Sequence, residues 1–339
     1  MRAVKLMSCI LAIVASAAIH PAFAETPRGK LTGGERYILP EWFKTSFLDF
    51  QDDIEEARKQ GKHLLVFMHL EECPYCVKML KENFVDGERR ERIQENFDVI
   101  DVNIRGVREL VWVDGVRYIE RTLAGHLKVV ATPAVIFFDF DGNKVLQLNG
   151  YREPRAFGQA LDYVQAKHYR RESFPVYLMS QDKPSVYTLR QHPLFSTTSN
   201  FKGYQKPLAV LFEDRQCAEC SAFHDKVLNH PAVLAEMANI QFVRLDTDSD
   251  RPVVGLDGKT LTAGQWAKTM GLSYRPAVAF FNEGREIARM DGRLYHFHFS
   301  ERLRYVSGGY HRRYESYSKY SSARREELLG QGVTIDYAE

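Results

Sequence analysis

The sequence predicts an α/β protein made of two domains of one fold in tandem, each a central mixed sheet flanked by helices. Two observations lead to this prediction. Short sequence motifs recur in the same order at an offset of 142 to 144 residues. Within each half, segments with the pattern of strands alternate with segments with the pattern of helices. The length of 339 residues gives each half enough chain to bury its own core, and 45% hydrophobic residues is ordinary for a globular protein.

The repeat is clearest around two Cys-x-x-Cys motifs. Cys73-Pro-Tyr-Cys76 matches Cys217-Ala-Glu-Cys220, and PAVIFF at 133–138 matches PAVAFF at 276–281. The interval from the first cysteine to this proline is 60 residues in one half and 59 in the other. Several landmarks in one order at nearly one offset indicate that each half forms the same structural unit.

Hydrophobic periodicity and turn residues predict the elements of each half. For the first half we expect helices at 47–60, 118–126 and 154–168, helical sequence from the cysteines to residue 84, and strands at 63–70, 97–104, 134–140 and 144–148. For the second half we expect strands at 207–212, 240–246, 277–281 and 286–290, and helices at 261–270 and 299–307. Both halves therefore predict a strand directly before the cysteines and a hairpin directly after the proline.

The N-terminus has the pattern of a secretory signal peptide. Arg2 and Lys5 precede an apolar run at 6–19, and Ala-Phe-Ala at 22–24 offers small residues for cleavage before Glu25. The alternative is an uncleaved membrane anchor, but the run is shorter than the roughly 20 residues that a bilayer span needs. We therefore predict a signal peptide at 1–24 and a periplasmic protein.

The remaining chain divides into a first domain at 25–175, a second domain at 176–309 and a helical or flexible tail at 310–339. Removal of 1–24 leaves 44 basic residues against 44 acidic ones. This balance gives no electrostatic reason to expect binding to nucleic acid or to an anionic membrane.

All four cysteines beyond the predicted signal peptide lie in the two motifs. A sulfur at the start of a helix lies beside free backbone N–H groups and the positive end of the helix dipole, so its thiolate is stabilised. We therefore expect Cys73 and Cys217 to be the nucleophiles, and Cys76 and Cys220 the resolving thiols. Pro74 supports a helix that starts at Cys73, because proline is tolerated in the first helical turn.

Other roles for the cysteines are weaker. A zinc site would need the two pairs to converge from opposite halves of the chain, and the tiny loops within each motif constrain the unfolded chain poorly. We expect no metal and no cofactor. Glu219 between Cys217 and Cys220 should disfavour the thiolate, which predicts different redox potentials for the two sites.

These motifs together resemble the thioredoxin superfamily, and the resemblance covers nearly all of the chain after residue 24. It implies a thioredoxin-like fold for each domain. It also implies that Pro133 and Pro276 are cis prolines facing the cysteines, with Thr132-Pro133 and Arg275-Pro276 holding extended substrate. For a proline at a strand entry, the alternative is an ordinary edge position. The first half is similar to exported bacterial thioredoxins, including those of sulfur oxidation.

The chain also departs from thioredoxin. Glu72 and Gln216 stand where thioredoxin has tryptophan, and Phe67 and Leu211 replace its buried acid. Four nearby residues could assist proton transfer, although we expect each to be a plain solvated side chain: His69, Glu71, Glu213 and Asp214.

The functional prediction is an exported thiol–disulfide oxidoreductase, acting as a reductase or isomerase. Its partners would be exported proteins with disulfides or thiols, and a membrane thiol protein would supply electrons. One alternative is a peptide-binding module or chaperone in which one or both sites are not catalytic. Another is a redox relay between the domains, which predicts an interdomain mixed disulfide.

Overall fold

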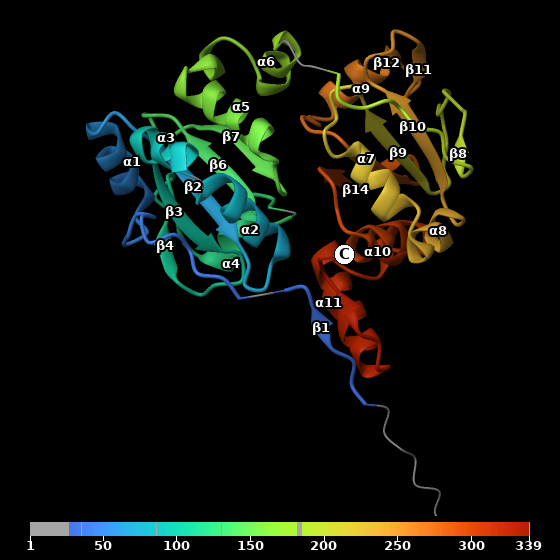
Figure 1. The fold of residues 1–339 in the computed structure, drawn as a ribbon, viewed down its shortest axis with the longest axis horizontal. Helices are drawn as coiled ribbons and strands as arrows, with labels where there is room; N and C mark the ends of the chain where they lie inside the picture. Colours follow the sequence, from blue (N-terminus) through green and yellow to red (C-terminus); the bar gives the residue numbers. More distant parts are fainter. Residues whose placement is uncertain (1–26, 35, 86, 130, 182–184, 339) are drawn as a thin grey trace, which may run out of the picture.

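A computed structural model describes residues 27–34, 36–85, 87–129, 131–181 and 185–338. Two lobes of α/β structure lie side by side, with the first half of the chain in one and the second half in the other (Figure 1). Each lobe contains a central mixed sheet with helices on both faces. The predicted tandem α/β fold is confirmed. The predicted signal peptide lies outside the described residues.

The first sheet has the order β3-β2-β6-β7. Its strands are β2 (His63–His69), β3 (Phe97–Asn103), β6 (Ala134–Phe138) and β7 (Lys144–Asn149). Strand β3 pairs in parallel with β2, whereas β6 pairs antiparallel with both β2 and β7. Central strand β2 is buried on both faces, which explains the unbroken apolar run at 64–68 between its terminal histidines. Leu65 and Phe67 pack into one layer of the core, and Leu64, Val66 and Met68 pack into the other.

The helices of the first domain cover both faces of this sheet. They are α1 (Phe50–Lys59), α2 (Pro74–Met79), α3 (Gly87–Asn96), α4 (Glu120–His126) and α5 (Pro154–Gln165). Side chains from α2, α3 and α5 pack with Phe67, and side chains from α1 and α4 pack with Val66. At the start of α1, the Asp49 carboxylate accepts hydrogen bonds from two backbone N–H groups, which satisfies donors that the helix leaves free.

The second sheet has the order β14-β13-β9-β10-β8. It consists of β8 (Phe195–Ser196), β9 (Leu208–Glu213), β10 (Gln241–Asp246), β13 (Ala277–Asn282) and β14 (Arg285–Asp291). Helices α8 (Pro231–Met237) and α10 (His296–Ser307) cover one face, and α9 (Ala263–Thr269) covers the other. The core of the second domain therefore repeats the two-layer plan of the first.

Finer features also recur between the domains. The helix after each motif continues as a π-helix, α2 into η1 (Leu80–Phe84) and α7 (Cys220–Phe223) into η3 (His224–Leu228). Each domain has a small antiparallel hairpin before the next helix: β4 (Glu109–Val111) with β5 (Arg117–Ile119), and β11 (Pro252–Val254) with β12 (Thr260–Thr262). Asp114-Gly115 and Asp257-Gly258 occupy matching positions in the turns of these two hairpins.

The segments at the ends of the domains form additional structure. Around the predicted boundary at 175, α6 (Phe174–Ser180) follows η2 (His168–Arg170), and Phe174 and Tyr177 pack into the first core. The tail forms η4 (Tyr310–Arg312), α11 (Tyr317–Gly330) and β15 (Ile335–Asp336), and β15 pairs in parallel with β1 (Leu31–Thr32). The N-terminal and C-terminal segments of the chain are thus joined by backbone hydrogen bonds. The exact domain boundaries stay a prediction.

Among the described residues, no helix combines the length and the apolar character that are needed to cross a membrane.

Candidate thiol–disulfide sites

The first site lies where β2 passes into α2. Cys73 caps α2, Pro74 is the first helical residue, and Cys73 and Cys76 form a disulfide. The backbone N–H of Cys76 donates a hydrogen bond to Sγ of Cys73 at 3.1 Å. The expected helix start at Cys73 is therefore confirmed. This N–H and the helix dipole would stabilise a thiolate at Cys73 in the reduced protein.

The loop before β6 faces this disulfide. The Thr132–Pro133 peptide bond is cis, as the resemblance implied, and Oγ1 of Thr132 lies 3.5 Å from Sγ of Cys73. Only 4% of Cys73 is exposed, and Cys76 is fully buried. The structure thus brings Thr132, Pro133 and the first cysteine pair together.

A polar network adjoins the first site. The Tyr37 hydroxyl lies 2.8 Å from Nδ1 of His69 and donates to the carbonyl oxygen of Leu70, and Nε2 of His69 lies 3.5 Å from Asp101. Burial opposes ionisation of Asp101, but the His69 hydrogen bond and the Arg108 charge outweigh it and lower the pKa of Asp101. His69 is buried, so the expectation of a solvated side chain is wrong for this residue.

The second site differs in its helix start. Cys217 and Cys220 form a disulfide, but α7 begins at Cys220 and its cap is Glu219. The expectation that the Cys217 sulfur lies at a helix start is therefore wrong. Proline at the second motif position presets the helical backbone of the first site, and Ala218 at the matching position has no such constraint.

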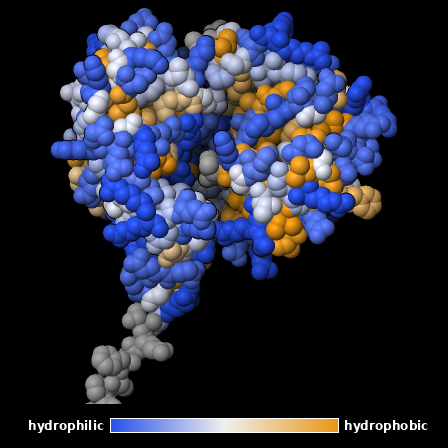
Figure 2. All heavy atoms as spheres, turned by 180° about the vertical axis from the view of Figure 1, so that it is seen from behind, coloured by the Kyte–Doolittle hydropathy of each residue, from blue (hydrophilic) through white to orange (hydrophobic). Residues whose placement is uncertain are grey.

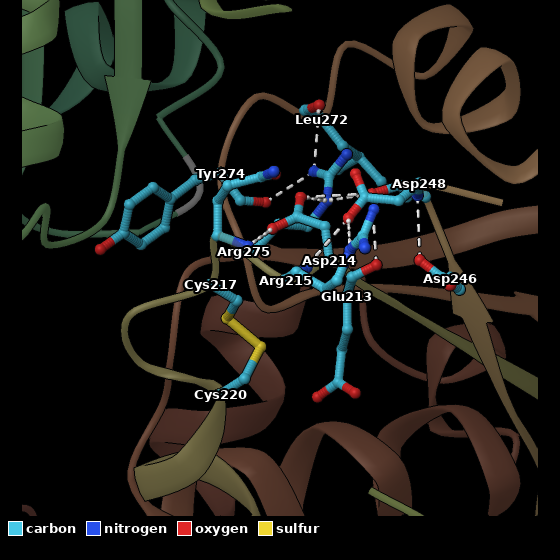
Figure 3. A network of polar contacts seen from close by, with 12 residues as sticks. Glu213, Asp214, Arg215, Cys217, Cys220, Asp246, Asp248, Leu272, Tyr274 and Arg275 are labelled. Atoms are coloured by element: carbon cyan, nitrogen blue, oxygen red, sulfur yellow. Dashed lines mark hydrogen bonds and ion pairs between the residues drawn. A yellow bond between two sulfur atoms is a disulfide. The ribbon is translucent and has the colours of Figure 1, made fainter. Parts of the chain in front are cut away.

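The second site also has a cis proline, after Arg275 instead of threonine. The Arg275 side chain is mostly enclosed beside Asp214, with 15% of it exposed and Nε 3.4 Å from Oδ2. Its Nη1 donates to the carbonyl oxygen of Tyr274 at 2.8 Å. Burial lowers the pKa of Arg275, and the Asp214 charge opposes that shift. Figure 3 shows this network above the Cys217–Cys220 disulfide, with Tyr274 extending towards the first domain.

A buried chain of three polar side chains adjoins the second disulfide. Tyr187, from the segment that joins the domains, forms a small buried cluster with Cys217 and Cys220. Its hydroxyl donates to Oε2 of Glu213 at 3.2 Å, and Nε2 of His224 lies 2.8 Å from Oε1 of Glu213. Burial, and then the Glu213 charge, raise the pKa of Tyr187, so its hydroxyl stays a donor.

Glu213 was expected to be a solvated side chain, and this expectation is wrong because it is 0% exposed. It occupies the same repeat position as His69, at the end of the central strand. Its place at the end of an apolar strand was a signal for burial. Its partner Tyr187 could not be found from sequence, because no periodicity links the joining segment to the site.

No metal centre accompanies either pair in the part of the chain that the structure describes. There, no three side chains among histidine, cysteine, aspartate and glutamate converge as potential metal ligands. Both cysteine pairs are instead disulfides within their own domains.

Comparison with known proteins decides the family. The sequence profile of the thioredoxin-like domain matches the chain twice, at residues 50–165 and 194–307, which is more than half of its length. The chain belongs to the thioredoxin-like family. It is a tandem thioredoxin-like protein, and each domain carries a Cys-x-x-Cys pair at disulfide distance. This is the arrangement of a thiol–disulfide exchange protein.

Individual relatives are distant. The chain is 23% identical to the thiol:disulfide interchange protein DsbD of Tatumella citrea over 159 residues, which are 46% of this chain and 25% of that protein. It is 24% identical to DsbD of Colwellia psychrerythraea, over 30% of this chain and 15% of that protein. The matches thus span a quarter or less of these relatives.

Among solved structures, a thioredoxin-fold protein from Helicobacter pylori is 25% identical, with a TM-score of 0.30, and the match covers 33% of this chain and 74% of that one. A thioredoxin from Thermus thermophilus is 24% identical, with a TM-score of 0.29, over 35% of this chain and 85% of that one.

The positions of the family's buried acid are apolar in both thioredoxin-like domains. Phe67 and Leu211 are fully buried in the cores of their domains. The titratable groups nearest in the chain are instead His69 and Glu213, two residues further along the same strands. The two sites therefore place different chemical groups at equivalent positions.

Proposed function

We propose that this tandem thioredoxin-like protein is an exported thiol–disulfide oxidoreductase that works by dithiol–disulfide exchange at both sites. The observation that carries the proposal is the geometry of the first site. There, the Cys73 sulfur caps α2 and accepts the Cys76 N–H, with the Thr132 hydroxyl at 3.5 Å. Three sources of partial positive charge surround one sulfur, and each favours its thiolate.

The exchange proceeds in two steps. In the reduced protein, the thiolate of Cys73 or Cys217 attacks a substrate disulfide and forms a mixed disulfide. The resolving thiol, Cys76 or Cys220, then attacks that bond, releases the reduced substrate and closes the disulfide of the site. Substrate backbone would lie along Thr132-Pro133 at the first site and Arg275-Pro276 at the second, because these loops border the disulfides.

The resolving thiol of the second site must lose its proton while it is fully buried. In this proposal the carboxylate of Glu213, supported by His224, accepts that proton beside the Cys217–Cys220 cluster, and the Tyr187 hydroxyl stabilises the carboxylate. Buried groups can exchange protons efficiently only with partners close by. At the first site, His69 stands at the equivalent position.

The cell compartment and partners follow from the same proposal. The predicted signal peptide directs the protein to the periplasm, where disulfide-containing proteins are its substrates. A reductase in an oxidising compartment needs a supply of electrons, and a membrane thiol protein is the proposed donor. The names of the DsbD relatives support thiol-based partners of this kind.

The test is reduction of a model protein disulfide with dithiothreitol as electron source. The Cys73→Ser, Cys217→Ser double variant should lose the catalysed rate. Each single variant should keep the part of that rate that the intact site contributes. Full activity in the double variant would overturn the proposal.

A further inference from the structure

The loops that surround the two disulfides are also the loops through which the domains touch. Tyr75, between Cys73 and Cys76, packs its ring on Tyr295 of the second domain with centroids 4.7 Å apart. The backbone N–H of Tyr295 donates to the Tyr75 hydroxyl at 2.7 Å. The motif loop of the first domain is therefore anchored directly to the second domain.

The second motif takes part in the same interface. Glu219, between Cys217 and Cys220, is only 8% exposed, and its Oε1 lies 3.7 Å from Nζ of Lys78, two residues after Cys76. Arg293 of the second domain lies 3.5 Å from the same oxygen. Burial raises the pKa of Glu219 and the two cations oppose that shift. An ionic contact thus links the two motifs across the interface.

A third contact joins the remaining loops of the two sites. Arg152, just after β7 and 2% exposed, donates to the Asp291 carboxylate at 2.6 Å and to its carbonyl oxygen at 2.8 Å. Its guanidinium also lies 4.6 Å from the ring centroid of Tyr274, which directly precedes Arg275-Pro276. A buried arginine with this many partners is a specific contact between the domains.

These loops are the ones that an external partner would have to reach. For exchange, a partner must bring its sulfur to Cys73 or Cys217, next to the motif, the cis proline and the loop after the hairpin. In this structure the other domain contacts both motif loops, through Tyr75 and Glu219, and it also contacts Tyr274 beside the second cis proline. Each domain therefore contacts the other through the loops that a redox partner would use.

We propose that the two sites are redox partners of one another and pass electrons between the domains, with the observed interface as the encounter arrangement. This proposal rests on the proposed function, because it requires reactive cysteine pairs. Figure 2 shows that the surface is hollowed between the lobes on the face drawn there. Domain interfaces within one chain commonly allow small relative motions, and such a motion would bring the first cysteines into contact while Tyr75 and Tyr295 keep the two loops together.

The transfer is a balanced pair of exchanges. The Cys73 thiolate attacks Sγ of Cys217, the Cys73–Cys217 bond forms, and the Cys217–Cys220 bond breaks, leaving a Cys220 thiolate that takes up a proton. The Cys76 thiolate then attacks Sγ of Cys73 and releases Cys217. The first site is oxidised by two electrons and the second is reduced by two, and the reverse direction uses the same intermediate.

The test uses the exported chain from Glu25 onward with Cys76→Ser and Cys220→Ser, in which only Cys73 and Cys217 remain. One equivalent of the aromatic disulfide 5,5′-dithiobis(2-nitrobenzoate) modifies one thiol and releases one thionitrobenzoate. The other thiol should then displace the second, at a rate independent of protein concentration. Peptide mapping should identify a Cys73–Cys217 disulfide in a monomeric chain. A linked dimer, or release that stops at one equivalent, would overturn the relay.

Three control variants make the result specific. With Cys73→Ser and Cys217→Ser instead, only the fully buried Cys76 and Cys220 remain, and we expect no interdomain bond. In the chain with Cys76→Ser and Cys220→Ser, the further change Tyr295→Ala removes the ring that stacks on Tyr75. It should slow release of the second thionitrobenzoate about tenfold, because an aromatic contact of this kind changes an equilibrium by roughly a factor of ten. Tyr118→Ala removes a tyrosine whose ring packs on His126 within the first domain, and it should change neither phase.

The two proposals fail in different ways. Thiols that react with the reagent no faster than free cysteine in the first phase would contradict the proposed function itself. A fast first phase with an unchanged or faster second phase in Tyr295→Ala would leave exchange with external disulfides in place and overturn the encounter role of this interface.

Discussion

The substitution Glu213→Gln probes how the second site handles the proton of its resolving thiol. Glu213 is fully buried, its two oxygens are bonded to Tyr187 and His224, and Tyr187 packs with the disulfide. Glutamine keeps the size and the hydrogen-bonding capacity of the side chain, but it cannot accept a proton. The variant should therefore fold, while the thiolate of Cys220 forms less readily at neutral pH.

The magnitude follows from the contacts. A hydrogen bond to a charged group contributes about 1.5–3 kcal/mol to stability. Glutamine still forms hydrogen bonds but carries no charge, so we expect the free energy of unfolding to fall by about 1–2 kcal/mol. A positioned general base contributes about 10²- to 10⁴-fold to a rate. We expect the resolving step to slow by about a hundredfold at neutral pH. The difference should narrow only at pH values well above about 8.5, the value for a free thiol, because burial opposes ionisation.

The assay measures release of a model mixed disulfide at the second site, in a chain with Cys73→Ser and Cys76→Ser, across the pH range. The matched control is Glu301→Gln, because Glu301 is also a buried glutamate of the second domain and accepts the Tyr320 hydroxyl at 2.6 Å, with no part in either site. Both variants should lose similar stability, and only Glu213→Gln should alter the pH profile. Equal profiles in the two variants would refute this role.

Two further predictions concern the segments around the motifs. In Gly34→Ala, the added Cβ would lie 2.7 Å from the carbonyl oxygen of Glu72, so we expect a loss of about 1–3 kcal/mol in thermal or urea unfolding. Gly158→Ala in α5 meets no atom within 4 Å and should instead gain about 0.5–1 kcal/mol. Because burial raises the pKa of Glu219, the folded state holds this proton to higher pH than the unfolded state does. The unfolding free energy should therefore fall as pH rises from about 4.3, the ordinary glutamate value, through the raised pKa. Glu219→Gln should abolish this fall, and an unchanged pH dependence of urea unfolding would contradict the assignment.

The sequence predicted the elements whose patterns are local. Strands such as β2 and β6 are continuous apolar runs, because both faces of the sheet are covered, and the Pro74 helix start follows from backbone geometry. The cis prolines came from family resemblance, since nothing local distinguishes them from edge positions. Helix α3 was missed because its only buried residue is Ile93, which leaves no amphipathic pattern to detect.

The features that define the two sites depend on distant parts of the chain. Tyr187 reaches Glu213 from the joining segment, and Tyr75 reaches Tyr295 from 220 residues away. Neither contact leaves a periodic signal, because one residue of each pair lies in an irregular segment. For the same reason the pairing of β1 with β15 could not be predicted. The chemistry of each motif is thus a local property, whereas its proton partners and its redox partner are set by tertiary structure.

The most direct test of the central claim is the pH dependence of alkylation of the reduced chain by iodoacetamide, with Cys73 and Cys217 followed separately by peptide mapping. We predict that Cys73 titrates well below the value of about 8.5 for a free thiol, because its sulfur caps a helix and accepts the Cys76 N–H. Cys217, which lacks the helix start, should titrate higher than Cys73 and still react faster at neutral pH than the resolving thiols. Alkylation of both residues as slow as that of free cysteine would contradict the account.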